Sequence, residues 1–550
     1  MKNINLIIAL LLVITSMSLN AQSRNAEVTV EGKYTPHIQK SERLVKTPDI
    51  PKRDFSIPNY EINTEDFSYR YKADLEPISP LSYTHNNKTS ITNNFIKAGI
   101  GTRLSPDFLF RHYSNITKRT SLGIGVDHNS TWLGMKDYPN LKYMNNAFAL
   151  SMTNRFSQFQ LHSHVDYHYD TYHINDMAIG DARKIHSLNA DVTANNNKSG
   201  YKGLYDEFSL KYSYSGIQNG MQENFLRFKA HLEHSNSWFR YGKGTQTLAI
   251  DVNADLNVIE QSQFIISANP HLAFDGEYYK LHLGFRLDAK TNSISMGGIY
   301  PDIKGSLYLF QRNIEFYAGL GGMTKINTLK EILEENPFVV SNPLNYAEFD
   351  YEKTWIDFQG GLKFKALNLV NGHIGVRYRR IDNKMFFINS TTQAGAFEVI
   401  FNNCYVFNFN IDLHARINDN IKAVADFAYN KYDFIKARQT DDVPITIAHA
   451  WYKPEIELTL KGIYQTNKRW NFNMATYLEG RRYALTGNTY DDIKELKPIV
   501  DIQLGCDYNF NEDLSFYAEI KNLIHNKYQI YYNYPSYGFQ AFVGFKYRFL

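Results

Sequence analysis

The sequence predicts an all-β protein, namely a transmembrane antiparallel β-barrel of about 22 strands. Three observations predict this fold class: strands that alternate apolar and polar side chains, an N-terminal export signal, and connections that are short and long in turn. The alternation is clearest in residues 405–417, a stretch long enough for a tilted strand that spans a membrane. It recurs in residues 279–288 and 226–233, where one face is aliphatic or aromatic and the other is charged. In a barrel the charged face lines the lumen.

Residues 1–21 have the pattern of a signal peptide. Lys2 is followed by an apolar run at 6–14, and Leu19-Asn20-Ala21 forms a cleavage site before Gln22. Residues 22–92 then hold six of the chain's 16 prolines, which argues against regular strands. We interpret residues 22–92 as a periplasmic or lumenal segment. The alternative is a flexible leader that has no fixed position. The barrel is expected to occupy residues 93–550.

Composition supports a barrel over a helical membrane protein. The mature chain has no run of about 20 apolar residues, which a spanning helix needs, and its mean hydropathy is −0.42. The 40 Tyr and 36 Phe fit strands that end in aromatic girdles. A net charge of +3 is close to neutral for 550 residues and gives no argument for nucleic acid. Cys404 and Cys506 are expected to be free thiols.

The connections alternate in length toward the C-terminus. The short ones are predicted at 366–370, 418–420, 465–468 and 511–513, and the long ones at 382–403, 433–448, 485–496 and 524–537. With the C-terminus in the periplasm, the short set is periplasmic and the long set extracellular. Counting alternating segments from Phe95 gives 22 strands, within an even-numbered range of 18 to 22.

The longest predicted connection, 324–350, contains a helix-start signal. Thr328-Leu329-Lys330-Glu331 has the capping-box pattern, with an acidic residue three positions after a threonine. This predicts a short helix in an extracellular loop, and a surface turn is the alternative.

The end of the chain carries a family resemblance. Residues 539–550 read FQAFVGFKYRFL and place alternate aromatic residues on one strand face. Together with the positions listed next, this end resembles the barrel of TonB-dependent receptors: Ile520-Lys521-Asn522-Leu523, Tyr528, Tyr534-Pro535, Gly538, Gly544, Tyr547 and Phe549. Phe539 departs from the family, which usually has arginine there, and Leu550 places the last aromatic one residue before the end. The resemblance implies that Phe545, Tyr547 and Phe549 act as the signal for the barrel-assembly machinery.

The resemblance also implies a location and two candidate functions. It places the chain among the lipids of the outer membrane of a Gram-negative bacterium. The family carries a globular plug before the barrel, but residues 22–92 contain no plug-like motif and no TonB box, so we expect a plugless barrel. The first function is passive or partner-assisted solute transport. The alternative is a structural or scaffold subunit of a larger outer-membrane complex, with a lumen blocked by the long loops and by 22–92 and with a periplasmic or outer-membrane partner protein.

One cluster has metal-ligand chemistry. His162, His164, Asp166 and His168 fall on one strand face, and imidazoles two residues apart can share one Zn²⁺. Barrel interiors commonly contain such polar residues because the lumen holds water, so we expect no metal site. If the chain does bind a metal, these four residues are the candidate ligands. No local motif selects a catalytic serine, and the glycine-rich fragments 99–101 and 123–125 lie in strands. We therefore expect neither an enzyme nor a bound cofactor.

Basic residues are predicted on the lumen face. They are Lys229, Arg286, Arg377, Arg379, Lys546 and Arg548. Such a lining favours anionic solutes. The alternative is that these residues pair with acidic neighbours such as Asp288, Asp412 and Glu519.

Overall fold

The computed structural model describes residues 94–175, 182–196, 204–236, 245–259, 262–291, 295–343, 351–366, 369–435, 444–466 and 469–549. The predicted signal peptide and the proline-rich segment 22–92 lie outside these residues. No helix among the described residues is long and apolar enough to cross a membrane.

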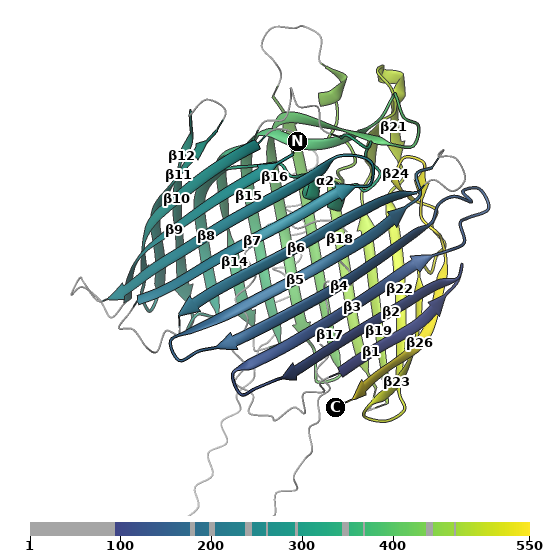
Figure 1. The fold of residues 1–550 in the computed structure, drawn as a ribbon, viewed down its shortest axis with the longest axis horizontal. Coiled ribbons are helices and arrows are strands. Elements are labelled where there is room, and N and C mark those ends of the chain that lie inside the picture. The colour runs from purple at the N-terminus through teal and green to yellow at the C-terminus, as the bar shows by residue number, and fades with distance from the viewer. Residues whose placement is uncertain are drawn as a thin grey trace, which may run out of the picture. The chain divides into compact units, whose positions relative to one another are not determined.

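The described chain forms one closed antiparallel barrel of 22 strands (Figure 1). Each strand pairs with the next along the chain, and the first pairs with the last, Asn94 lying opposite Phe549. The predicted fold class and strand number are confirmed. The barrel strands are β1 (Asn94–Gly101), β2 (Ser105–Asn115), β3 (Thr120–Thr131), β4 (Tyr143–Arg155), β5 (Phe159–Tyr172), β6 (Arg183–Asn196), β7 (Leu204–Ile217), β8 (Gln222–Asn236), β9 (Thr245–Val258), β10 (Ser262–Asp275), β11 (Tyr279–Lys290), β12 (Ser295–Leu309), β13 (Ile314–Lys325), β14 (Glu352–Ala366), β15 (Val370–Asn389), β16 (Phe397–Arg416), β17 (Ile421–Phe434), β18 (Ile456–Gln465), β19 (Trp470–Glu479), β22 (Ile499–Asn509), β23 (Leu514–Lys521) and β26 (Gln540–Phe549).

The two faces of each barrel strand differ as the alternation predicts. On β8, Leu226, Phe228 and Leu232 are 39 to 41% exposed and point outward. The residues between them include Arg227 and His231, which bond to carboxylates of the neighbouring strand β9. Side chains opposite each other across a strand pair share a face, so this pattern continues around the ring. The outer face is therefore the apolar face that lipid requires.

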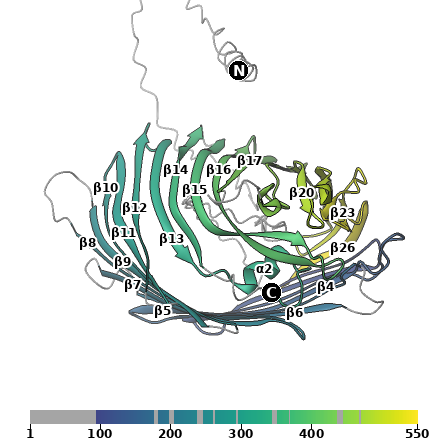
Figure 2. The same cartoon turned by 90° about the horizontal axis from the view of Figure 1, so that it is seen from above.

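Smaller elements occupy the long connections at one end of the barrel. They are α2 (Leu329–Glu335), η2 (Ile445–Ile447), η3 (Tyr490–Asp492), the pair β20 (Arg482–Leu485) and β21 (Ile493–Leu496), and the pair β24 (Gln529–Tyr531) and β25 (Tyr534–Pro535). Seen from above, α2 lies within the ring of strands (Figure 2). The four predicted short turns all join consecutive strands at the other end.

The predicted helix is confirmed, and its place is more interior than a surface loop. Thr328 caps α2, with its hydroxyl accepting the N–H of Glu331 at 3.2 Å. Leu329, Ile332 and Leu333 are buried. The residues that cover these three side chains come from elsewhere in the chain. The local sequence therefore predicts where the helix begins but not that it is buried.

One predicted connection is wrong. The long loop expected at 382–403 is mostly strand, since β15 continues to Asn389 and β16 begins at Phe397. The register shifts between Ile381 and Lys384, and beyond this shift the two strands of the hairpin pair with each other and with no other barrel strand, because β14 pairs with β15 as far as Asp382 and β17 pairs with β16 as far as Cys404. Met385, Phe386 and Phe387 are consecutive and all buried, so both faces of this hairpin are covered. A strand covered on both faces loses the apolar–polar alternation that marks a half-exposed one.

The two cysteines are free, as predicted. Cys404 is buried on β16 and Cys506 is partly exposed on β22.

Candidate functional site: the lumen wall and the loop core

The predicted basic residues lie on the strand positions that alternate with outward-facing apolar ones. Arg286 stands between the exposed Phe285 and Leu287, and Lys546 stands between the exposed Phe545 and Tyr547. The other predicted members occupy the same phase of their strands: Lys229, Arg377, Arg379 and Arg548.

Three of these basic residues are matched by carboxylates. Arg286 Nε lies 2.7 Å from Asp288 Oδ1, Lys546 Nζ lies 2.7 Å from Asp507 Oδ1, and Arg377 pairs with Asp357. Of the predicted acidic partners, Asp288 is confirmed. Asp412 instead bonds His373, and Glu519 lies near Lys521. Much of the positive charge on this face is therefore neutralised within the wall.

The metal candidate is only partly assembled. The Asp166 carboxylate lies between His164 Nε2 and His168 Nε2, at 3.2 Å from each. His162 turns to the Thr153 hydroxyl instead. No group of three or more His, Cys, Asp or Glu side chains within the described ranges has a metal-holding arrangement. Zinc binding by these four residues stays a prediction; in the structure Asp166 pairs with His164 and His168, and His162 bonds Thr153.

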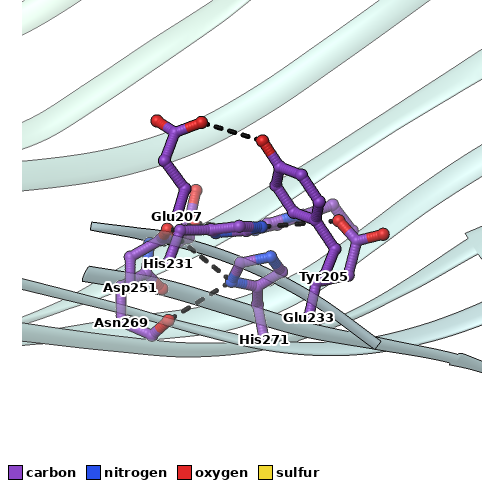
Figure 3. Close-up of polar contacts among 9 residues, drawn as sticks. Tyr205, Glu207, His231, Glu233, Asp251, Asn269 and His271 are labelled. Atoms are coloured by element: carbon purple, nitrogen blue, oxygen red, sulfur yellow. Dashed lines mark hydrogen bonds and ion pairs between the residues drawn. The ribbon is translucent and has the colours of Figure 1, made fainter. Parts of the chain in front are cut away.

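A longer histidine–carboxylate network lies on strands β8 to β12, and Figure 3 shows the part of it that contains His231, Asp251 and His271. His231 bonds Asp251 at 2.6 Å, and His271 approaches the second oxygen of Asp251 at 3.6 Å. The His271 ring stacks on His282 at 4.3 Å, and His282 bonds Asp302 at 2.7 Å. Its members come from five strands, so the sequence alone could not reveal it without the strand register.

The long connections meet in one apolar cluster, which we term the loop core. Its buried members are Leu141, Ile185, Ile217, Met221, Leu329, Ile332, Leu333, Val339, Ile381, Met385, Phe386, Phe387, Phe397, Cys404, Val406, Trp451, Tyr452, Ala484, Leu485, Leu496, Tyr531 and Tyr534. These residues belong to the connections after β3 and β7, to strands β6 and β7, to the connection that contains α2, to the β15–β16 hairpin and to the last three long connections. Because one apolar cluster has members from opposite parts of the ring, it must cross the end of the barrel.

Aromatic stacking organises the centre of the loop core. Phe338 stacks on Tyr534 at 3.9 Å, and Phe397 packs against Tyr452 and Tyr531. Burial raises the pKa of the Tyr452 hydroxyl well above its usual value. Burial also lowers the pKa of His449, whose ring stacks on Tyr483 at 3.9 Å. The loop core is therefore an apolar environment in which charged forms are disfavoured.

Helix α2 connects the loop core to the lumen wall. The Glu223 carboxylate on β8 accepts the N–H groups of Leu329 at 2.8 Å and Lys330 at 3.2 Å. At the other end of the helix, Glu335 pairs with Lys453, and its carbonyl accepts the Tyr531 hydroxyl at 2.6 Å. The helix is therefore fixed at both ends, once to the wall and once to the other loops.

Sequence comparisons give no relatives, whereas structural comparisons give many. No protein-family model matches the chain, and no curated protein matches it. The chain is similar in structure to the ferric-catecholate import receptor Fiu from E. coli K12, with a TM-score of 0.63 at 10% identity, over 83% of this chain and 82% of that one. It is similar to the siderophore receptor PiuA from Acinetobacter baumannii, with a TM-score of 0.59 at 12% identity and coverage of 83% and 82%. It is also similar to the copper transporter OprC, with a TM-score of 0.59 at 11% identity and coverage of 83% and 80%.

At sequence identities this low, the structural matches establish the fold and nothing more. The matched proteins are receptors and a transporter by name, and the expectation that this chain is not an enzyme stays a prediction. The expected absence of a plug concerns residues outside the described part. What the described residues show is the 22-stranded outer-membrane barrel fold of the TonB-dependent receptors.

Proposed function

We propose that this protein is a transport barrel of the Gram-negative outer membrane whose lumen is closed at rest by the loop core. The observation that carries the proposal is the loop core, a buried cluster that joins connections and strand ends from opposite parts of the ring. A barrel of 22 strands encloses a lumen that is normally plugged. In this chain the long connections themselves supply an obstruction at one end.

The loop core favours partner-assisted over passive transport. Phe386, Phe397 and Trp451 are fully buried within it. Truncating one buried aromatic side chain of this size costs about 3–5 kcal/mol, so spontaneous separation of the whole cluster is rare. A solute therefore needs help to pass, either from its own binding energy or from a periplasmic partner. The structural matches, which include a ferric-catecholate receptor and a copper transporter by name, support a siderophore or metal complex as the solute.

The same closed end favours one alternative, a scaffold subunit of a larger outer-membrane complex. A barrel that never opens needs no solute and can still hold a partner protein at the membrane. The proline-rich segment 22–92 is the part of the chain we assign to such docking, or to filling the lumen from the periplasmic side.

Two measurements, one of uptake and one of bound partners, separate these functions. Cells lacking the protein are compared with complemented cells for uptake of a radiolabelled ferric-catecholate complex and of copper. The tagged protein is also purified in mild detergent. Transport predicts reduced uptake of at least one of these solutes in the deletion strain. Unchanged uptake of both, together with a stoichiometric partner in the purified material, contradicts transport and supports the scaffold.

A further inference from the structure

Polar side chains of the lumen wall bind helix α2 of the same chain. Asp166 on β5 lies opposite Asn189 on β6, and Asn189 lies opposite Ser213 on β7. Asn189 Nδ2 donates to Asp166 Oδ2 at 2.7 Å, and the Ser213 hydroxyl donates to Asn189 Oδ1 at 2.8 Å. The three side chains form one fixed row across adjacent strands.

The ammonium group of Lys330 binds this row. Lys330 Nζ donates to Asn189 Oδ1 at 2.7 Å, next to the hydroxyl of Ser213. Asn189 is 6% exposed and Ser213 is 4% exposed, so the ammonium meets a buried polar surface. Its partner on its own helix, Glu334, is 3.8 Å away and largely exposed. The closer contact is therefore the one with the wall.

Glu223 binds the backbone of the same lysine. Its carboxylate accepts two successive N–H groups, those of Leu329 and Lys330, and Glu223 as a whole is 1% exposed. No ion pair joins Glu223 to a basic side chain in the described part of the chain. A buried carboxylate without a cation depends on such hydrogen bonds, because leaving it without donors is costly. Glu223 and the Asn189 row together recognise one lysine through its main-chain N–H and its side-chain ammonium.

We propose that this wall surface is a binding site for an amine-bearing peptide chain, and that Leu329–Lys330 occupies it in the closed barrel. The proposal rests on the proposed transport function, since transport requires the loop core to open and α2 to leave the wall. A seven-residue helix has almost no stability of its own, so α2 stays only while the wall and the loop core hold it. Although the Ser213 hydroxyl still donates to Asn189 Oδ1, Glu223 and Asn189 lose the donors that α2 supplies when the loop core opens and α2 leaves. A ligand with an amide N–H and an ammonium group at lysine spacing restores them.

The first test supplies the α2 segment as a separate molecule. Residues 328–336 are replaced by a Gly-Ser linker of equal length, and binding of fluorescein-labelled TLKEILEE peptide is followed by fluorescence polarisation in detergent. We expect saturable binding to this variant and at least about 10-fold weaker binding to the intact protein, whose site is occupied. A peptide with norleucine in place of lysine should bind about 10-fold or more weakly, because it lacks the charged donor. Equal affinities for the two peptides, or no saturable binding to a folded variant, would overturn the proposal.

A second test leaves the loop in place. Lys330→Ala removes the ammonium and leaves room for a small amine. We expect butylammonium to raise the thermal unfolding midpoint of Lys330→Ala, and to leave unchanged that of the wild type and of Lys330→Ala combined with Asn189→Leu. Tetramethylammonium at equal ionic strength is the control because it cannot donate a hydrogen bond. Equal effects of the two cations on Lys330→Ala would overturn the proposal.

These readouts are independent of flux. Absent binding with intact uptake overturns the site and leaves the transport function standing. Binding with unchanged uptake in the deletion strain overturns the transport function and leaves the site.

Discussion

The Tyr517 ring on β23 reaches across β26 to contact Gly99 on β1, the first strand of the barrel. Tyr517 lies opposite Gly544 on β26, and Gly544 lies opposite Gly99. A Cβ atom at either glycine would overlap the tyrosine ring or its hydroxyl. Lys97 and Lys546 stand over the same ring, with Nζ atoms 5.0 and 5.4 Å from its centroid. The seam that closes the barrel is thus covered by one aromatic side chain, for which two glycines leave space.

Gly99→Val should weaken the closure of the barrel. The added side chain displaces Tyr517 from the seam, and overpacking of this kind costs about 1–3 kcal/mol. The measurement is the temperature at which the folded band is lost in an unheated-versus-heated gel shift. Gly462→Ala on β18 is the matched control, because no heavy atom lies within 4 Å of the position its Cβ would take. A Gly99→Val barrel as heat-resistant as Gly462→Ala would contradict this interpretation of the seam.

Tyr534→Phe should loosen the loop core without changing its shape. The Tyr534 hydroxyl donates to the Gly395 carbonyl at 2.6 Å and accepts the Asn175 N–H at 3.1 Å. Removing it leaves two backbone groups without partners, which costs about 1–3 kcal/mol for each buried group. Limited proteolysis of the long connections measures the effect, and Tyr547→Phe on the outer face is the control. Equal cleavage rates for the two variants would count against the role of Tyr534.

Acidification should weaken the loop core through His449. Burial holds its pKa below the usual 6.5, in spite of the nearby Glu455, so the closed loops favour the neutral imidazole. The stabilisation is complete above about pH 6.5 and is lost as the pH falls toward the lowered value, since only the opened state takes up the proton. Protease accessibility of the loops at pH 7.5 and pH 5.5 tests this. His449→Phe keeps the stacking partner for Tyr483 and should show less pH dependence; an unchanged pH profile would refute the assignment.

The C-terminal aromatic residues should control assembly of the barrel. Phe545 and Tyr547 are 40% exposed on the outer face of β26, and Tyr547 stacks on Phe549 at 5.4 Å. We predict that Phe549→Ser lowers the amount of folded protein in outer-membrane fractions several-fold, because the family resemblance implies that the assembly machinery recognises this end of the chain. Phe316→Ser, another outward aromatic residue, serves as control. An equal loss of folded protein in both variants would contradict a specific assembly signal, because any lipid-facing aromatic residue would then have the same effect.

The sequence predicts those parts of the fold whose signal is local. The alternation around Leu226 and Phe228 reports a half-exposed strand, and Thr328 reports the start of α2. The hairpin around Phe386 escapes prediction because burial on both faces removes the alternation.

The site is harder to predict than the fold because its residues come from separate parts of the chain and leave no local signal. Asp166, Asn189 and Lys330 become neighbours only through strand register and the return of a loop into the barrel. Neither is encoded in spacing along the chain. Of the four residues in the predicted metal candidate, only Asp166 belongs to this surface. The sequence suggested Asp166 as a zinc ligand, whereas in the structure it accepts a hydrogen bond from Asn189.

The most direct test of the central claim is single-channel conductance of the purified barrel in planar bilayers, compared with Trp451→Ala. Trp451 is fully buried in the loop core, and its indole N–H donates to the Thr446 carbonyl at 2.8 Å. Truncating it costs about 3–5 kcal/mol of the energy that holds the loops together. If the loop core closes the lumen, the wild type shows no steady conductance and Trp451→Ala shows frequent openings, while Tyr490→Ala on the exposed η3 turn stays closed. A wild-type barrel with a large, steady conductance equal to that of Trp451→Ala would contradict the account.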